Sequence, residues 1–259
     1  MESTVEVEPV SVSVRNLCKS FGTQEVLRGV SFEVPAGGIF VLMGPSGSGK
    51  SVLLRHLVGL EASESGEVLI GGGDANKLET RERYRTAMVF QAGALFNSMS
   101  VYDNLALYPR EHRLYDEATI REKVEQVMKV LSIETAGAKI PAELSGGMKK
   151  RVAVARAIIM EPELILYDEP TSELDPILAA TTSELIATIS RETHATSLVV
   201  THDRDLARSI ADRVALLIDG RLVFAGNPDE LENSPDERVQ EFMNPTINPD
   251  KPRFRKQET

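Results

Sequence analysis

The sequence has no tryptophan and a single cysteine, Cys18, among its 259 residues. One cysteine excludes an internal disulfide, and its place in a stretch of alternating apolar residues predicts a small buried side chain rather than a reactive thiol. Long apolar runs are also lacking, since runs such as Ile39–Met43 and Ala215–Ile218 are far shorter than the roughly 18–20 residues that cross a bilayer. We therefore expect a protein that is soluble by itself.

Positive charge is scarce, because 29 Lys and Arg face 39 Asp and Glu, for a net charge of −10. The basic residues are scattered, which argues against a surface that binds nucleic-acid phosphates. The one basic cluster, Lys149-Lys150-Arg151, is interpreted as the solvated face of a helix. The N-terminal segment MESTVEVEPV is acidic and lacks the basic start and apolar stretch of an export signal. The sequence thus predicts a cytoplasmic protein that does not bind nucleic acid.

Apolar and polar residues alternate over residues 11–34, which predicts a pair of antiparallel strands. Ile39–Met43 is a continuous apolar run that ends in a glycine-rich turn, which predicts a central parallel strand and then a helix over about residues 49–60. Further strands are predicted at 67–70, 87–90, 164–167, 197–200 and 214–218, and helices at about 176–192 and 204–211. Strands that alternate with helices predict an α/β fold with a mostly parallel sheet.

The pattern turns helical between about residues 92 and 160, where Ile120, Val124, Val127 and Leu131 recur at the spacing of an amphipathic helix. Beyond about residue 227 the chain is polar and rich in proline, which predicts an extension rather than core. We therefore expect one domain over residues 9–227, with a helical subdomain at about 92–160, and a C-terminal extension over 228–259.

A phosphate-binding pattern, G-x-x-x-x-G-K-[ST], follows the predicted central strand and opens a helix. Its glycines let backbone N–H groups and the positive end of the helix face phosphates. Lys50 adds a cation for the β- and γ-phosphates of ATP, and the Ser51 hydroxyl suits Mg²⁺. A chance match by a glycine-rich turn is the alternative, and the strand-turn-helix context argues against it. The residues are Gly44, Pro45, Ser46, Gly47, Ser48, Gly49, Lys50 and Ser51.

Two carboxylates, Asp168 and Glu169, end the predicted strand at 164–167. Asp168 suits the Mg²⁺ shell, and Glu169 suits the orientation and deprotonation of the water that attacks the γ-phosphate. A plain helix-start turn is the alternative. Gln91 and His202 also follow predicted strands, where an amide could reach the metal or water and an imidazole the γ-phosphate. For an isolated histidine, a structural role is the alternative.

A further motif, Leu-Ser-Gly-Gly-Met, lies in the predicted helical region. Ser145 can cap a helix whose first turn carries Gly146 and Gly147, which makes a second anion site from a hydroxyl and bare N–H groups. This segment resembles the signature motif of ABC transporter ATPases, and the motif order matches that family over about residues 11–226. The order is phosphate-binding loop, Gln91, signature at 144–148, acids at 168–169, Ser172-x-Leu174-Asp175, and His202.

The resemblance implies an ABC-type P-loop ATPase fold, with a mostly parallel RecA-like core sheet, an antiparallel β subdomain and an inserted α-helical subdomain. It also implies that two copies sandwich two ATP molecules, so that Ser145, Gly146, Gly147 and Asp175 contact ATP bound to the other copy. Gln91 becomes the Q-loop glutamine, which binds the metal, and His202 the switch histidine. Phe21 stands where the family stacks an aromatic ring on adenine, and core packing is its alternative.

Met148, with the segments Phe90–Phe96 and Asp103–Leu105, resembles the Mla/MCE branch of the family, which moves phospholipids or other lipids between membranes. That branch implies a peripheral subunit on the cytoplasmic face of the inner membrane, with membrane contact only through partners. The implied partners are a multispan permease, an MCE-domain lipid carrier and a small regulatory subunit. Glu173 departs from the small residue usual in this family.

Two segments invite expectations about contacts. A permease helix is expected to dock around residues 92–108, where the candidates are Leu95, Phe96, Met99 and Val101, with core packing as the alternative. The stretch Pro235–Pro245 is similar to the family tail, which reaches the neighbouring ATPase. The alternatives in function are an importer ATPase for another substrate, a soluble ABC ATPase of repair or assembly, and a small-molecule kinase.

Overall fold

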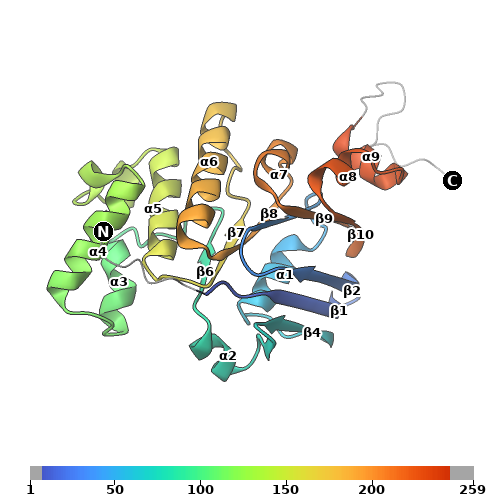
Figure 1. Ribbon diagram of the computed structural model, residues 1–259, viewed down its shortest axis with the longest axis horizontal. Helices are drawn as coiled ribbons and strands as arrows, with labels where there is room; N and C mark the ends of the chain where they lie inside the picture. The colour runs from blue at the N-terminus through green and yellow to red at the C-terminus, as the bar shows by residue number, and fades with distance from the viewer. Residues whose placement is uncertain (1–7, 246–259) are drawn as a thin grey trace.

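Two sheets organise the protein, whose structure is a computed structural model that describes residues 8–245 (Figure 1). Within this range, a four-stranded antiparallel sheet has the order β2-β1-β4-β5, and a six-stranded sheet has the order β10-β9-β3-β8-β7-β6. The small sheet consists of β1 (Val12–Phe21), β2 (Gln24–Val34), β4 (Ser65–Ile70) and β5 (Gly73–Asp74). The large sheet consists of β3 (Ile39–Met43), β6 (Thr86–Val89), β7 (Leu164–Asp168), β8 (Thr196–Thr201), β9 (Arg213–Ile218) and β10 (Arg221–Gly226).

Five strands of the large sheet are parallel, and β10 pairs with β9 as an antiparallel edge. The predicted antiparallel pair at 11–34 is β1 with β2, so both sheet predictions are confirmed. Helices connect the strands: α1 (Lys50–Leu57), α2 (Leu78–Arg83), α3 (Val101–Glu111), α4 (Glu117–Val130), α5 (Gly146–Ile158), α6 (Pro176–Thr193) and α7 (Arg204–Ile210). Among the described residues, no helix is long and apolar enough to cross a membrane.

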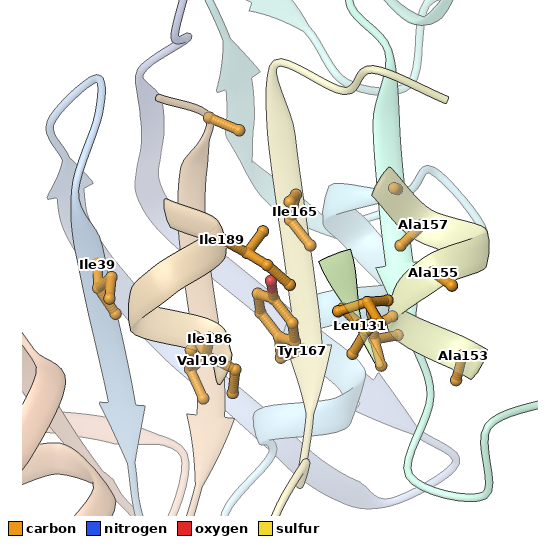
Figure 2. Close-up of a cluster of buried hydrophobic side chains, with 14 of the residues drawn as sticks. Ile39, Leu131, Ala153, Ala155, Ala157, Ile165, Tyr167, Ile186, Ile189 and Val199 are labelled. Atoms are coloured by element: carbon orange, nitrogen blue, oxygen red, sulfur yellow. The ribbon is translucent and has the colours of Figure 1, made fainter. Parts of the chain in front are cut away.

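Side chains of the large sheet alternate between two apolar cores, as the pleat of a strand requires. On β3, Phe40 and Leu42 face a core shared with α1 and the small sheet. Val41 and Met43 face the opposite core, which contains residues of α5 and α6. Figure 2 shows this second core, where Tyr167 of β7 lies among Ile186 and Ile189 of α6. Apolar residues on both faces explain why β3 reads as a continuous apolar run.

The helical region lies at one end of the molecule, where α3, α4 and α5 pack together (Figure 1). Ser100 and Asp116 cap α3 and α4 with side-chain oxygens that accept backbone N–H groups. The buried Ile120 and Val124 confirm the amphipathic helix. The helical pattern nevertheless begins later than predicted, because residues 91–100 form a loop before Val101.

The segment after residue 227 differs from its prediction. Two short helices follow, α8 (Pro228–Glu232) and α9 (Glu237–Met243), which pack near α7, β9 and β10, and whose Leu231, Val239 and Met243 are buried in the core. The interpretation as an extension outside the core is therefore wrong for residues 228–243. These helices are too short to give a periodic signal against the prolines around them. The rest of the predicted extension, 246–259, lies outside the described residues.

Cys18 is half-buried rather than buried. It lies in β1 beside register shifts in the pairing with β2, and its sulfur accepts the N–H of Gly29 at 3.2 Å. The irregular pairing turns this side chain partly outward, which alternation alone does not predict.

Candidate functional site

The predicted phosphate-binding and acidic segments meet at one edge of the large sheet. Strands β3, β8 and β7 are parallel neighbours, so their carboxyl ends lie side by side. β3 leads into the phosphate-binding loop and α1, β7 ends at Asp168, and His202 follows β8. The register pairs Met43 with Thr201 and Asp168 with Val200. The topology therefore gathers segments that are far apart in the sequence.

The phosphate-binding loop needs glycine where its backbone is crowded. A Cβ at Gly44 would lie 2.2 Å from the carbonyl oxygen of Leu217, and one at Gly49, whose φ is +106°, would lie 3.0 Å from that of Val26. Gly49 is also the N-cap of α1, so the helix begins at Lys50 with free N–H groups toward the loop. A crowded glycine loop that leads into a helix start has the geometry expected of an anion-binding site.

Lys50 is 6% exposed and folds back over this loop. Its Nζ donates to the carbonyl oxygens of Gly44 at 2.7 Å and Pro45 at 3.0 Å. It also lies 3.4 Å from Oε1 of Glu169. The ammonium is thus held between the loop and the acidic end of β7, beside the start of α1.

Asp168 and Ser51 offer oxygen atoms to a hard cation. The Ser51 hydroxyl donates to Oδ1 of Asp168 at 3.3 Å. Burial raises the pKa of Asp168, and the nearby Glu169 carboxylate raises it further, whereas the Ser51 hydrogen bond lowers it. A carboxylate and a hydroxyl close together fit the oxygen ligands that Mg²⁺ prefers, and a cation there would relieve the crowding of the two carboxylates.

Glu169 is held in place by the turn after β7. Its φ is +47°, in the left-handed region, and its backbone N–H donates to the carbonyl oxygen of Val200 at 2.8 Å. Oε2 accepts the backbone N–H of His202 at 3.2 Å and the Thr201 hydroxyl at 3.2 Å, and lies 2.8 Å from Nδ1 of the His202 ring. A strained backbone that the surroundings hold in this way is typical of a functional position.

The signature segment lies elsewhere in the same chain. Ser145 caps α5 as predicted, accepting the N–H of Met148 at 3.3 Å, and both Ser145 and Gly146 are exposed. Figure 1 shows α5 beside α4 and α6, apart from α1 on the far side of the large sheet. Asp175 caps the neighbouring helix α6. These residues do not join the phosphate-binding loop of their own chain.

Two further predicted site residues, Gln91 and Phe21, are exposed. Gln91 is exposed, and the structure fixes its backbone, whose carbonyl oxygen accepts Nζ of Lys150 at 2.5 Å. Phe21 is 45% exposed at the end of β1, with Nζ of Lys19 at 5.1 Å from the ring centroid. An exposed ring is consistent with stacking and excludes the core alternative. Within the described residues, neither side chain has a hydrogen bond to the phosphate-binding loop.

The basic cluster at the start of α5 is not a solvated face. Lys149 is exposed as predicted, but Lys150 and Arg151 are half-buried. Arg151 donates to the carbonyl oxygen of Leu131 at 3.3 Å, as Lys150 does to that of Gln91. Tertiary contacts of this kind cannot be predicted from the local pattern of charged residues.

Asn104 is another residue whose structural role the sequence pattern does not predict. It is fully buried on α3, where its amide oxygen accepts the N–H of Phe96 at 2.8 Å. Its amide nitrogen donates to the carbonyl oxygens of Phe96 at 3.1 Å and Ser100 at 2.9 Å. Asn104 thereby fixes the loop before α3.

A groove of about 450 Å³ runs between α3, α5 and the end of β6. Phe96 lines it, as expected for a docking residue, whereas Val101 is fully buried and belongs to the core. Leu95 also packs against the core. The groove is mostly apolar, with lining residues that include Met88, Phe90, Phe96, Leu107, Tyr108 and Arg156.

A second hollow, of about 530 Å³, opens beside the phosphate-binding loop. Ser46 and His202 line one side of it, and Arg238 and Phe242 of α9 line the other. The Arg204 guanidinium donates to the carbonyl oxygen of Met243, which joins α9 to the segment after His202. The C-terminal helix therefore borders the site, which the sequence pattern did not predict.

Comparison with known proteins agrees with this geometry. Residues 27–172 match the ABC transporter family. The probable ribonucleotide transport ATP-binding protein mkl of Mycobacterium leprae is 41% identical over 239 residues, which are 91% of this chain and 69% of that protein. The sulfate/thiosulfate import ATP-binding protein CysA of Vibrio vulnificus is 39% identical over 238 residues, 90% of this chain and 69% of that protein.

Solved structures share the fold. That of cbiO1 from Clostridium perfringens, part of the ABC transporter complex cbiONQ, has a TM-score of 0.78 and 28% identity, over 90% of this chain and 95% of that one. A dimeric post-hydrolysis state of the ATP-binding cassette MJ0796, bound to ADP and Pi, has a TM-score of 0.74 and 30% identity, over 84% of this chain and 98% of that one. The chain belongs to the ABC transporter family, as an ATP-binding member that hydrolyses ATP.

Proposed function

We propose that this chain powers a transporter that moves phospholipid or another lipid between membranes, and that it works as a symmetric dimer with two ATP molecules between the copies. The observation that carries the ATPase part is the meeting of Lys50, Ser51, Asp168 and Glu169 at one sheet edge, with Lys50 Nζ 3.4 Å from Glu169. An anion site, two carboxylates and a cation at one edge are what phosphoryl transfer requires.

Each residue at this edge has a proposed role. The loop Gly44–Ser51 and the start of α1 hold the phosphates, and Phe21 stacks on adenine. Ser51 and Asp168, with Gln91, hold Mg²⁺, which neutralises charge on the phosphates. Glu169 orients and deprotonates the attacking water, and His202 contacts the γ-phosphate. These parts lie within the proposed ATPase domain, residues 9–227.

The second anion site serves the other copy. Ser145, Gly146 and Gly147 are at the exposed start of α5, apart from the phosphate-binding loop of their own chain. In a head-to-tail dimer with two-fold symmetry, the start of α5 covers the γ-phosphate of ATP on the partner, and Asp175 lies beside it. The dimeric structure bound to ADP and Pi, a protein 30% identical to this chain, supports the dimeric state of the proposal.

A permease helix is the proposed occupant of the groove beside Phe96. The relative cbiO1 is part of an ABC transporter complex, which supports a membrane partner for this chain. The groove is mostly apolar and is lined by Phe90, Ala94 and Phe96, on either side of Gln91 in the chain, so a helix seated there could change the position of this loop. The chain would then be peripheral on the cytoplasmic face of the inner membrane, with an MCE-domain protein and a small regulatory subunit as further partners.

Lipid is the proposed cargo because Met148, Phe90–Phe96 and Asp103–Leu105 resemble the Mla/MCE branch. The second candidate is an importer for another substrate, which the names of the mkl and CysA relatives favour. Purification of the chain with its permease, followed by mass spectrometry of bound small molecules, separates the two. Phospholipid in the complex supports the proposal, and a nucleotide or sulfate-binding partner with no lipid contradicts it.

The docking groove has its own test. Leu107→Asp places a charge in the groove at a position outside the loop that carries Gln91, so it should weaken copurification with the permease while the isolated chain keeps its ATPase activity. Val130→Asp is the matched control, since Val130 is 52% exposed on α4 and does not line the groove. Equal recovery of permease with both variants would remove the groove from the interface.

A further inference from the structure

Two cations of α5 reach across to the loop that carries Gln91, here called the Q-loop (Gln91–Phe96). Lys150 Nζ donates to the carbonyl oxygen of Gln91 at 2.5 Å. Arg156, nearly two turns later on the same helix, donates to the carbonyl oxygens of Ala94 at 2.6 Å and Gly93 at 3.4 Å. Three carbonyl groups of one short loop therefore point to a single helix.

Both cations are desolvated in this contact. Burial lowers the pKa of Arg156, and no carboxylate opposes this effect. Burial also lowers the pKa of Lys150, which the carboxylates of Glu173 and Glu169 partly oppose. A buried cation is costly unless it is paired, and Arg156 contacts backbone carbonyl groups and the ring of Phe96, whose centroid is 6.0 Å away. The two side chains therefore bind the backbone carbonyl groups of the Q-loop.

The conformation of the Q-loop depends on these hydrogen bonds from Lys150 and Arg156. Gly93 and Ala94 have φ values of +76° and +47°, in the left-handed region, which for alanine is strained. Gly93 also approaches α5 closely, since a Cβ there would lie 3.5 Å from that of Ala153. Asn104 fixes the other end of the loop through Phe96. The Q-loop is therefore held between α3 and α5, with its strained part against α5.

We propose that Lys150 and Arg156 are positioning residues for ATP hydrolysis, which set the place of Gln91 by fixing the Q-loop to the helix that begins at Ser145. This inference rests on the proposed role of Gln91 at the metal. In the proposed dimer, Gln91 of one chain acts on the ATP bound to that chain, whereas Ser145 of the same chain contacts the ATP bound to its partner. A loop fixed to α5 moves with it, so closure of one site on Ser145 repositions Gln91 in the other site.

The test compares Lys150→Met and Arg156→Met, which keep much of the aliphatic stem but remove the donors, in the complete chain. A displacement of about 1 Å in a catalytic group can lower the rate by up to about 100-fold. We therefore expect kcat to fall by about 10- to 100-fold in each variant, while KM for ATP changes by less than about twofold. Lys150→Arg keeps a donor and should restore most of kcat. Lys149→Met is the control, because Lys149 is exposed on the same turn.

Two further measurements separate positioning from general damage. Hydrogen exchange of the peptide that covers residues 90–98 should rise in both methionine variants and not in Lys149→Met, with Tm nearly unchanged. In a Gln91→Ala background, Lys150→Met should have little further effect on kcat, because it acts through Gln91.

The outcomes are distinct. If Gln91→Ala alone leaves kcat unchanged, the proposed role of Gln91 fails. If Gln91→Ala lowers kcat but Lys150→Met and Arg156→Met do not, or lower it by the same factor in both backgrounds, the positioning inference is overturned. Unchanged hydrogen exchange in the methionine variants also overturns it.

Discussion

Nδ1 of His202 lies 2.8 Å from Oε2 of Glu169, and the backbone N–H of His202 donates to the same oxygen at 3.2 Å. The other carboxylate oxygen, Oε1, lies 3.4 Å from Nζ of Lys50. One oxygen of Glu169 is thus fixed by the segment after β8, and the other faces the phosphate-binding loop. This arrangement joins three of the predicted motifs through a single carboxylate.

Glu169→Gln removes the proposed base but keeps the shape of the side chain. We expect turnover to fall by at least about 100-fold, which is the usual contribution of general base catalysis, while ATP still binds and the dimer persists. ATPase assays and size-exclusion chromatography with ATP measure both effects. Glu184→Gln, at an exposed position on α6, is the control. Normal hydrolysis by Glu169→Gln would take Glu169 out of the base role.

His202→Ala removes the ring that contacts Glu169 and, in the proposed mechanism, the γ-phosphate. We expect kcat to fall about 10- to 100-fold with a small change in ATP affinity, because the backbone N–H of residue 202 still holds Oε2. Steady-state kinetics measure this, with the exposed His194→Ala as the control. A larger change in KM than in kcat would show that His202 acts in binding rather than in turnover.

Asp168→Asn should abolish hydrolysis that depends on Mg²⁺ yet raise the Tm without nucleotide, by about 2–4 °C for each kcal/mol of stability gained. Burial and Glu169 raise the pKa of Asp168, so the folded protein holds this proton more tightly than the unfolded chain does. Ionisation of Asp168 therefore costs stability. The cost is absent below the ordinary aspartate pKa and is complete above the raised one.

The gain from Asp168→Asn should therefore be larger at pH 8 than at the lowest pH at which the chain stays folded. Thermal unfolding across this pH range measures it. Glu122→Gln, at an exposed position on α4, is the control and should show no such trend. A Tm that falls in Asp168→Asn at pH 8 would mean that the charge stabilises the fold.

Met243→Ala tests the finding that α9 belongs to the core. Met243 is 2% exposed, so its truncation should lower the free energy of unfolding by about 2–5 kcal/mol. Chemical unfolding measures this change, and Glu237→Gln on the exposed side of α9 is the control. If the two variants had the same free energy of unfolding, residues 237–243 would not contribute to the core, and α9 would be a surface extension.

Motifs and short continuous apolar runs could be predicted from the sequence because their cause is local. Ile39–Met43 and the glycine-rich loop after it fix a strand, a turn and a helix start within a few residues. The meeting of Asp168 with Ser51 then follows from parallel strand order, which the alternation of strands and helices indicates. The position of the candidate site at the edge of the sheet could therefore be predicted from the sequence.

The roles of side chains that bind distant backbone groups could not be predicted from the sequence. Lys150 and Arg156 belong to a helix whose charge pattern resembles any solvated face, and their acceptors are carbonyl groups some 60 residues earlier, with sequence separations of 59 and 62. Asn104 likewise holds a loop through three carbonyls and one N–H. Backbone acceptors carry no residue identity, so the sequence holds no pattern that reveals such contacts.

A mixture of two inactive variants tests the shared ATP site most directly. Ser145→Arg should block the site on the partner, and Lys50→Ala should block the chain's own phosphate-binding loop, so each variant alone forms a dimer with no complete site. A mixed dimer has one complete site, since the loop of the first chain faces the start of α5 in the second. Random pairing makes half of the dimers mixed, which predicts about a quarter of the normal ATPase activity on mixing. Activity that stays at the level of the separate variants would contradict a site built from two copies.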